Sequence, residues 1–210
     1  MRFGGMPLAV LEEDEIEKKK YLVDLFTKTY FKDILEHNHL QKSEALDELC
    51  TVLSDSVSEL INADKIAHTY QSRKHENINR ETVEKYIGYF VDAFLLKEAT
   101  RYNVKGKREI GALREYYFVD TGLRKARLNF PKPDEGHLME NVIYNELIYN
   151  GYKVNIETYV CVTKKEGKSI KKIYEIDFFA TKGNRMYYIQ SAYDLSDELV
   201  YQREKSRISI

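Results

Sequence analysis

The 210-residue sequence has no tryptophan, only two cysteines and three prolines, and almost no net charge. Cys50 and Cys161 lie far apart and match no metal-binding or redox spacing, which argues against a disulfide framework and favours a reducing cytoplasm. The 33 basic and 34 acidic residues sum to −1, so a basic patch must be local. No apolar run approaches the roughly 20 residues that span a bilayer, so we expect no membrane partner.

The sequence does contain enough apolar residues for a core, since 43% are hydrophobic and 17 are tyrosines. Their periodicity predicts an α+β chain. Helical patterns dominate up to a break at Pro131-Lys132-Pro133, where two of the three prolines mark a linker. An α-β-β-β-α order is predicted after this break, and its last helix opens at Ser196.

Two amphipathic helices are predicted at the N-terminal end. The first covers 11–39, with an acidic first turn. The second is capped by Ser43 and carries Cys50 within an apolar stripe, so this thiol is predicted to be buried rather than reactive. The stripe of the first helix comprises Ile16, Val23, Phe26, Tyr30 and Ile34.

A helix-turn-helix followed by a hairpin is predicted next. Asn62 and Asn79 are candidate caps of two short-linked helices. Two strands, 95–103 and 113–120, are joined by a basic turn, and together these elements predict a winged helix.

The candidate DNA-binding residues lie at the start of the second helix and in the turn of the hairpin. In helix-turn-helix modules the second helix enters the major groove, and basic wing residues can contact phosphate. Between 97 and 127 nine basic residues face four acidic ones, a local excess of five. The alternative is a winged helix that serves as a structural or protein-interaction module. The candidates are Arg80, Thr82, Lys85, Lys105, Lys107 and Arg108.

Several short motifs together resemble one family. The sequence is similar to the C-terminal half of a class of prokaryotic AAA-type ATPases, in which a P-loop module is followed by a winged helix and a PD-(D/E)XK nuclease-like domain. The resemblance covers nearly the whole chain through its order and spacing. The motifs are Phe3-Gly4-Gly5-Met6-Pro7, Thr29-Tyr30-Phe31-Lys32-Asp33-Ile34, Thr82-Val83, Tyr86-Ile87, Ala93-Phe94-Leu95, Tyr117-Phe118-Val119-Asp120-Thr121-Gly122-Leu123, Glu140-Asn141, Asn145-Glu146-Leu147 and Glu175-Ile176-Asp177-Phe178.

The resemblance implies three parts. Residues 1–40 would be a linker helix after an ATPase module that this chain lacks, and 41–130 would be the winged helix. Residues 131–210 would be a truncated, degenerate restriction-endonuclease-like α/β domain. The sequence contains no G-x-x-x-x-G-K-[ST], so no ATP binding is expected without the missing module.

The resemblance also implies a metal-dependent nuclease site. Glu140 and Asp177 match two carboxylate positions that would hold Mg²⁺. The acid-x-Lys element is replaced by Gln190 and Ala192, which removes one charge and the lysine. We therefore expect a vestigial, inactive site and no cofactor in this chain, with Mg²⁺ required only if the site functions. The alternative is that Glu140 and Asp177 are ordinary solvated carboxylates.

These observations predict an accessory region of an AAA-type ATP-binding protein that binds DNA or a partner protein. A magnesium-dependent nuclease is the first alternative. The second is a protein-interaction or dimerisation module, because an α/β domain that ends early would leave a strand edge uncovered.

Overall fold

The structure, a computed structural model, describes residues 3–40, 44–74, 78–103, 108–132, 134–165 and 168–192. It is a mixed α+β fold with two compact units. The first unit comprises Met1–Glu98 with Glu115–Asp134, and the second comprises Ala99–Arg114 with Glu135–Ile210. A five-stranded mixed sheet has the order β2-β1-β3-β4-β5. No helix within the described ranges is long and apolar enough to cross a membrane.

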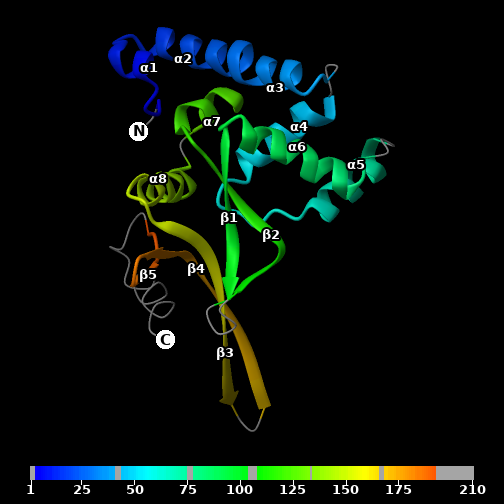
Figure 1. Ribbon diagram of the computed structural model, residues 1–210, viewed down its shortest axis with the longest axis vertical. Coiled ribbons are helices and arrows are strands. Elements are labelled where there is room, and N and C mark those ends of the chain that lie inside the picture. The colour runs from blue at the N-terminus through cyan, green and yellow to red at the C-terminus, as the bar shows by residue number, and fades with distance from the viewer. Residues whose placement is uncertain are drawn as a thin grey trace. The chain divides into compact units, whose positions relative to one another are not determined.

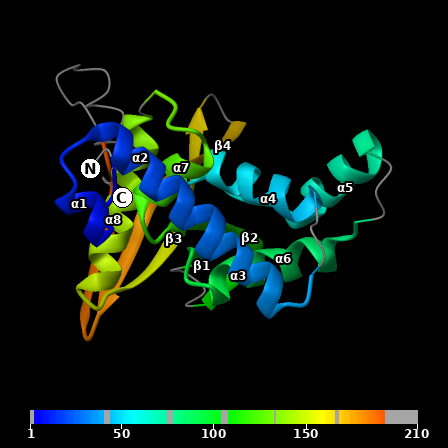
Figure 2. The same ribbon diagram turned by 90° about the horizontal axis from the view of Figure 1, so that it is seen from above.

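The first unit opens with four consecutive helical segments, the last three of which follow one line (Figures 1 and 2). Asp14 caps the second segment by accepting hydrogen bonds from the backbone N–H groups of Ile16 and Glu17. The predicted helix over 11–39 is therefore capped at Asp14 and contains a π-helical stretch. The segments are α1 (Pro7–Leu11), α2 (Glu15–Asp24), the π-helix η1 (Leu25–Phe31) and α3 (Lys32–His37).

The predicted apolar stripe of this helix is only partly correct. Phe26 and Ile34 are buried, but Ile16 is 73% exposed and Val23 is 37% exposed. Leu22 is fully buried instead. Two physical causes explain the difference. Ile16 lies in the first turn, and the wider turn of the π-helix shifts the phase of the residues around it.

Four further helices complete the helical part of the first unit. Cys50 is 1% exposed on the first of these, which confirms that its thiol is buried. Asn62 and Asn79 act as predicted caps, accepting from Lys65 N and Thr82 N. Ser43 lies outside the described residues. The helices are α4 (Glu44–Asp55), α5 (Ala63–Lys74), α6 (Arg80–Asp92) and α7 (Thr121–Arg127), and α7 was not predicted.

The second unit is built on a long antiparallel pair, β3 with β4, which forms an extended ribbon (Figure 1). Asn155 precedes an irregularity in this pair and donates from its side-chain amide to Thr100 O and Oγ1. Arg101 of β1 pairs in parallel with Ile156 of β3. The outer part of the hairpin formed by β1 and β2, Ala99–Arg114, therefore belongs to the second unit. The strands are β1 (Leu96–Asn103), β2 (Arg108–Phe118), β3 (Lys153–Lys165), β4 (Lys168–Lys182) and β5 (Arg185–Ile189).

Helix α8 (Glu135–Tyr149) packs against β3 and β4 and closes the core of the second unit. Tyr144 from the helix contacts Phe178 from β4, with ring centroids 6.2 Å apart. Ile176, Phe178 and Ala180 alternate along β4 and are all buried. Phe179, on the opposite face, is buried as well, so this strand is covered on both sides. The helix predicted from Ser196 lies outside the described residues.

Candidate functional site

A cluster of polar side chains lies where β4 pairs with the end of β5. The register pairs Phe178 with Ile189, so Asp177 on β4 is adjacent to Gln190, which directly follows β5. The resemblance implied that these two residues belong to one site, and the sheet does bring them together. Ser191 also belongs to this cluster, and the sequence did not predict it. It lies two residues after the end of β5, and its position beside Asp177 depends on where that strand ends.

Both oxygens of the Asp177 carboxylate accept hydrogen bonds from uncharged groups. Gln190 Nε2 donates to Oδ1 over 2.7 Å, and the backbone N–H of Ser191 donates to Oδ2 over 2.7 Å. The Ser191 hydroxyl donates to the same Oδ2. The carboxylate therefore ties the end of β5 to β4.

Gln190 leaves one unusual feature in this cluster. Its amide oxygen Oε1 is buried and accepts no hydrogen bond from the described residues. A buried acceptor without a donor is costly, so this oxygen favours an added donor or a cation.

The remaining predicted member, Glu140, lies half-buried on α8. Within the cluster itself, Asp177 and the Gln190 oxygen are the groups that could face a divalent cation. Among the described residues, however, no three His, Cys, Asp or Glu side chains are grouped as metal ligands. Magnesium prefers several oxygen ligands in octahedral geometry. The arrangement is suited to joining two strands, and its donor set is small for holding a metal.

The candidate DNA-binding residues of α6 are exposed but already engaged. Arg80 Nε donates to Glu84 Oε1 over 2.9 Å, and its Nη1 lies 3.4 Å from Asp64 Oδ2. These partners raise the pKa of Arg80 above its usual value, the Glu84 hydrogen bond most strongly. Thr82 Oγ1 donates to Asn79 Oδ1, and the Lys85 ammonium lies 5.8 Å from the Tyr89 ring centroid.

The predicted wing residues fall mostly outside what the structure describes. Lys105 and Lys107 lie outside the described residues, and only the backbone of Arg108 is described, as the first residue of β2. The described residues therefore do not test whether these three side chains lie near the candidate residues of α6.

The local basic excess predicted over 97–127 does not form one surface patch. Arg124 and Lys125 are only 5% exposed, and Arg124 Nε donates to Ser54 O over 2.7 Å. Burial lowers the pKa of Arg124. Arg127 is bound by Asp47 at 2.7 Å. Arg124, Lys125 and Arg127, three of the nine basic residues counted, therefore lie on a helix that packs inside the first unit and do not add to an exposed basic surface. The reason is that α7, which was not predicted, packs against α4.

Two motifs that are distant in sequence meet around Asp120. Its Oδ1 accepts from the N–H groups of Gly122 and Leu123 and caps α7, while Oδ2 accepts from Gly5 N over 2.6 Å. Gly4 has a φ of +70°, and a Cβ there would lie 2.2 Å from Oδ1. The glycines and Asp120 thus hold the N-terminal segment against the start of α7. Both motifs are visible in the sequence, but their contact is not.

Comparisons with known proteins return a family and two relatives. The family model described as "Domain of unknown function (DUF8612)" matches residues 1–134. An uncharacterized protein of Haemophilus influenzae is 28% identical over 196 residues, 93% of this chain and 46% of that protein. An uncharacterized protein of Methanocaldococcus jannaschii is 27% identical over 197 residues, 94% of this chain and 42% of that protein. The chain thus spans less than half the length of either relative. No solved structure matches it.

Proposed function

We propose that this chain, which belongs to the DUF8612 family, is a non-enzymatic region of a longer protein and binds duplex DNA. The supporting observation is the arrangement around α6. Helix α6 packs against both α5 and α4, and the paired strands β1 and β2 follow it directly. The same order of elements occurs in winged helices, in which the second helix of the pair enters the major groove and the hairpin contacts the backbone, and this supports the proposal.

The chemistry of the start of α6 is compatible with this role. Arg80 and Lys85 are exposed, and the Arg80 partners Glu84 and Asp64 are exposed too. Exposed ion pairs contribute little free energy, so a phosphate can replace the carboxylates at small cost. Helix N-termini also favour anions through their free N–H groups. We propose contacts by Arg80, Thr82, Lys85, Lys105, Lys107 and Arg108.

The second unit has a supporting, non-catalytic role in this proposal. We interpret it as a degenerate nuclease-like fold, in which Asp177 holds Gln190 and Ser191 instead of a catalytic metal. The longer proteins in which such regions occur would supply any ATPase activity, as the resemblance to AAA-type ATPases implies.

Fluorescence anisotropy with a labelled random-sequence duplex tests DNA binding. Lys85→Glu should weaken binding about fivefold to tenfold and reduce the salt slope by about 1, as expected for a lost phosphate contact. Lys20→Glu is the matched control, because Lys20 is an exposed lysine on α2 whose partner Glu17 lies 3.4 Å away. Equal weakening by both variants would mean that only net charge matters, and would contradict a site on α6.

Incubation of the duplex with Mg²⁺ or Mn²⁺ tests the nuclease alternative. The proposal predicts an intact duplex. Cleavage that disappears in Asp177→Ala would overturn the non-enzymatic assignment, while cleavage that persists in this variant would indicate a contaminating nuclease.

A protein-interaction module is the second candidate, and one specific observation favours it. Four apolar side chains of α1 and α2 are each more than half exposed: Leu8, Val10, Leu11 and Ile16. Such exposed apolar groups are typical of association surfaces. A concentration-dependent dimer mass in light scattering, lost in Leu11→Glu, combined with no DNA binding, would favour this candidate.

A further inference from the structure

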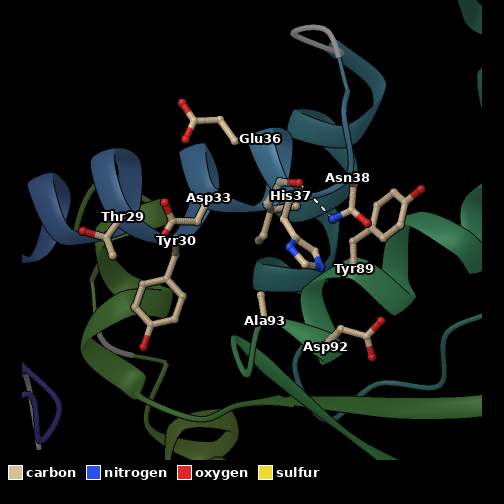
Figure 3. A pocket seen from close by; sticks show the side chains of 10 residues that line it. Thr29, Tyr30, Asp33, Glu36, His37, Asn38, Tyr89, Asp92 and Ala93 are labelled. Carbon is tan, nitrogen blue, oxygen red and sulfur yellow. Dashed lines mark hydrogen bonds between the residues drawn. The ribbon is translucent and has the colours of Figure 1, made fainter.

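A cavity of about 610 Å³ lies between the end of α3 and the end of α6 in the first unit (Figure 3). Its volume is in the range of small-molecule sites. Figure 3 shows Asp33 and Asp92 at opposite sides of this cavity with their carboxylates pointing apart, and the ring of Tyr89 turned away. A binding pocket needs polar groups that converge on a ligand, so this cavity is assigned no ligand.

In the second unit, the strand β5 lies at one edge of the sheet and is exposed along most of its length. Its first four residues are all exposed, and Met186 is 67% exposed. Natural edge strands are commonly protected against further pairing by charged side chains or proline. β2, at the opposite edge, carries four charged residues, whereas β5 carries only Arg185. β5 is therefore the less protected of the two edges.

The turn before β5 determines which of its backbone groups face outward. The residues that flank the two-residue turn 183–184 pair with each other, and Gly183 has a φ of +58°, as expected at the first central position of a type II′ turn. The residues that flank such a turn form a hydrogen-bonded pair, and the two kinds of pair alternate along an antiparallel ladder. The N–H and C=O groups of Arg185 and Tyr187 therefore point toward β4, whereas those of Met186 point away from it.

A second copy of β5 is complementary to this edge. In antiparallel pairing centred on Met186, the outward backbone groups of Met186 in the two copies bond to each other. Arg185 of each copy then lies opposite Tyr187 of the other, where a guanidinium can contact an aromatic ring. The Tyr187 ring is already positioned by Tyr152, with ring centroids 5.8 Å apart. The one charged side chain of β5 thus meets an aromatic ring, and like charges do not lie directly opposite each other.

We propose that β5 pairs with β5 of a second copy of this chain, in an antiparallel register centred on Met186. The contact joins two strands of five residues, which is small beside the roughly 1,200–2,000 Å² that specific interfaces bury. The dimer is therefore weak and depends on protein concentration. DNA binding is not required for this pairing, because the strand belongs to the second unit and the proposed DNA-binding residues of α6 belong to the first.

Sedimentation velocity of the full chain over a wide range of concentration tests whether this dimer forms. The unmodified chain should shift from monomer toward dimer as its concentration rises. Met186→Pro should weaken the dimer at least about tenfold, because it removes the central backbone donor from both copies. An edge strand tolerates proline where the N–H faces outward, so the variant should fold. Leu11→Glu is the control, because Leu11 is a similarly exposed apolar residue of the first unit.

Disulfide trapping tests the register, in a Cys161→Ser background in which the remaining Cys50 is buried. Arg185→Cys and Tyr187→Cys should cross-link to each other when the two variants are mixed under mild oxidation. Residues of a directly opposite pair that is not hydrogen-bonded have Cα atoms about 4.5 Å apart, within disulfide reach. Each variant alone is the matched control, because a residue and its own copy then lie on a diagonal about 7–8 Å apart, beyond that reach.

Three results would overturn the proposal. The first is an unmodified chain that stays monomeric at every concentration. The second is a dimer that Met186→Pro leaves intact or that Leu11→Glu weakens equally. The third is a mixture of the two cysteine variants that cross-links no more than either variant alone. Thermal unfolding checks that each variant is folded. If Met186→Pro does not fold, Met186→Lys replaces it, since two like charges opposite each other should also weaken the dimer.

Discussion

At the scale of single residues, Asp120 is a buried carboxylate that connects two distant segments of the first unit. One carboxylate accepts three backbone N–H groups, from Gly5, Gly122 and Leu123. Its charge also contributes, after burial, to a raised pKa of Tyr30. Charge-assisted hydrogen bonds of this kind are roughly twice as strong as neutral ones. Asp120 therefore fastens the start of the chain to the start of α7.

Gly122→Ala tests how closely the N-terminal segment packs against the start of α7. A Cβ at Gly122 would lie 2.3 Å from the backbone oxygen of Phe3, so we expect a loss of about 1–3 kcal/mol in unfolding free energy. Gly88→Ala is the control, because nothing lies within 4 Å of its Cβ position on α6. It should gain about 0.5–1 kcal/mol from helix propensity. Urea unfolding measures both, and equal effects would contradict the close approach.

Cys50 provides a second test at this scale. Burial raises the pKa of its thiol to about 12. The protonated thiol is therefore the form that the fold favours, and this contribution to stability is present below the unfolded pKa and is lost as pH rises toward 12. In a Cys161→Ser background, we expect a thiol reagent at pH 8 to label unfolded protein quickly and native protein hardly at all. Rapid native labelling would contradict the burial.

At the scale of elements, Arg127 links three helical segments. Its guanidinium donates from Nη1 and Nη2 to the carboxylate of Asp47 at 2.9 and 2.7 Å, and lies 5.8 Å from the Phe26 ring centroid. It also donates to Thr51 on α4. These contacts hold α7 against α4, with Phe26 of η1 alongside.

Arg127→Lys separates charge from geometry in this link. A lysine keeps the charge but loses the planar fork, so we expect a loss of about 1–2 kcal/mol in unfolding free energy. Arg127→Ala should lose about 2–3 kcal/mol, because it also removes the contact with Phe26. Thermal or urea unfolding measures both variants. Unchanged stability in Arg127→Lys would show that the fork geometry contributes nothing.

The sequence predicted most elements because their signals are local. Asn62 and Asn79 fixed the starts of two helices through short side-chain hydrogen bonds. Helix α7 was missed because it is short and its stability comes from Asp120 and from α4, which are tertiary partners. The apolar stripe was wrong at Ile16, which lies in the first turn of α2, and at Val23, where the neighbouring π-helix changes the period of the pattern.

The candidate sites were predictable to different degrees. The resemblance placed Asp177 and Gln190 in one site, and the pairing of β4 with β5 brings them together. The cavity beside Asp33 and Asp92 could not be predicted, because it needs the packing of α3 near α6. The excess of basic residues counted between 97 and 127 did not predict an exposed basic surface, because the sequence does not show which of these side chains become buried. Arg124 is one that does.

At the scale of the whole molecule, the chain consists of two compact units with different chemistry. The first offers an exposed helix start with Arg80 and Lys85, and an acidic cavity at the far end of the same helix. The second carries a carboxylate, Asp177, that joins β4 to the end of β5. These features are compatible with the DNA-binding region proposed above.

The most direct test of duplex binding is a salt titration of anisotropy with the unmodified chain. If Arg80, Lys85, Lys105, Lys107 and Arg108 each neutralise a phosphate, log K should fall against log salt with a slope of about −4 to −5. That slope would support duplex binding through a small set of cations. Absence of binding at low salt, or binding that salt leaves unchanged, would contradict it.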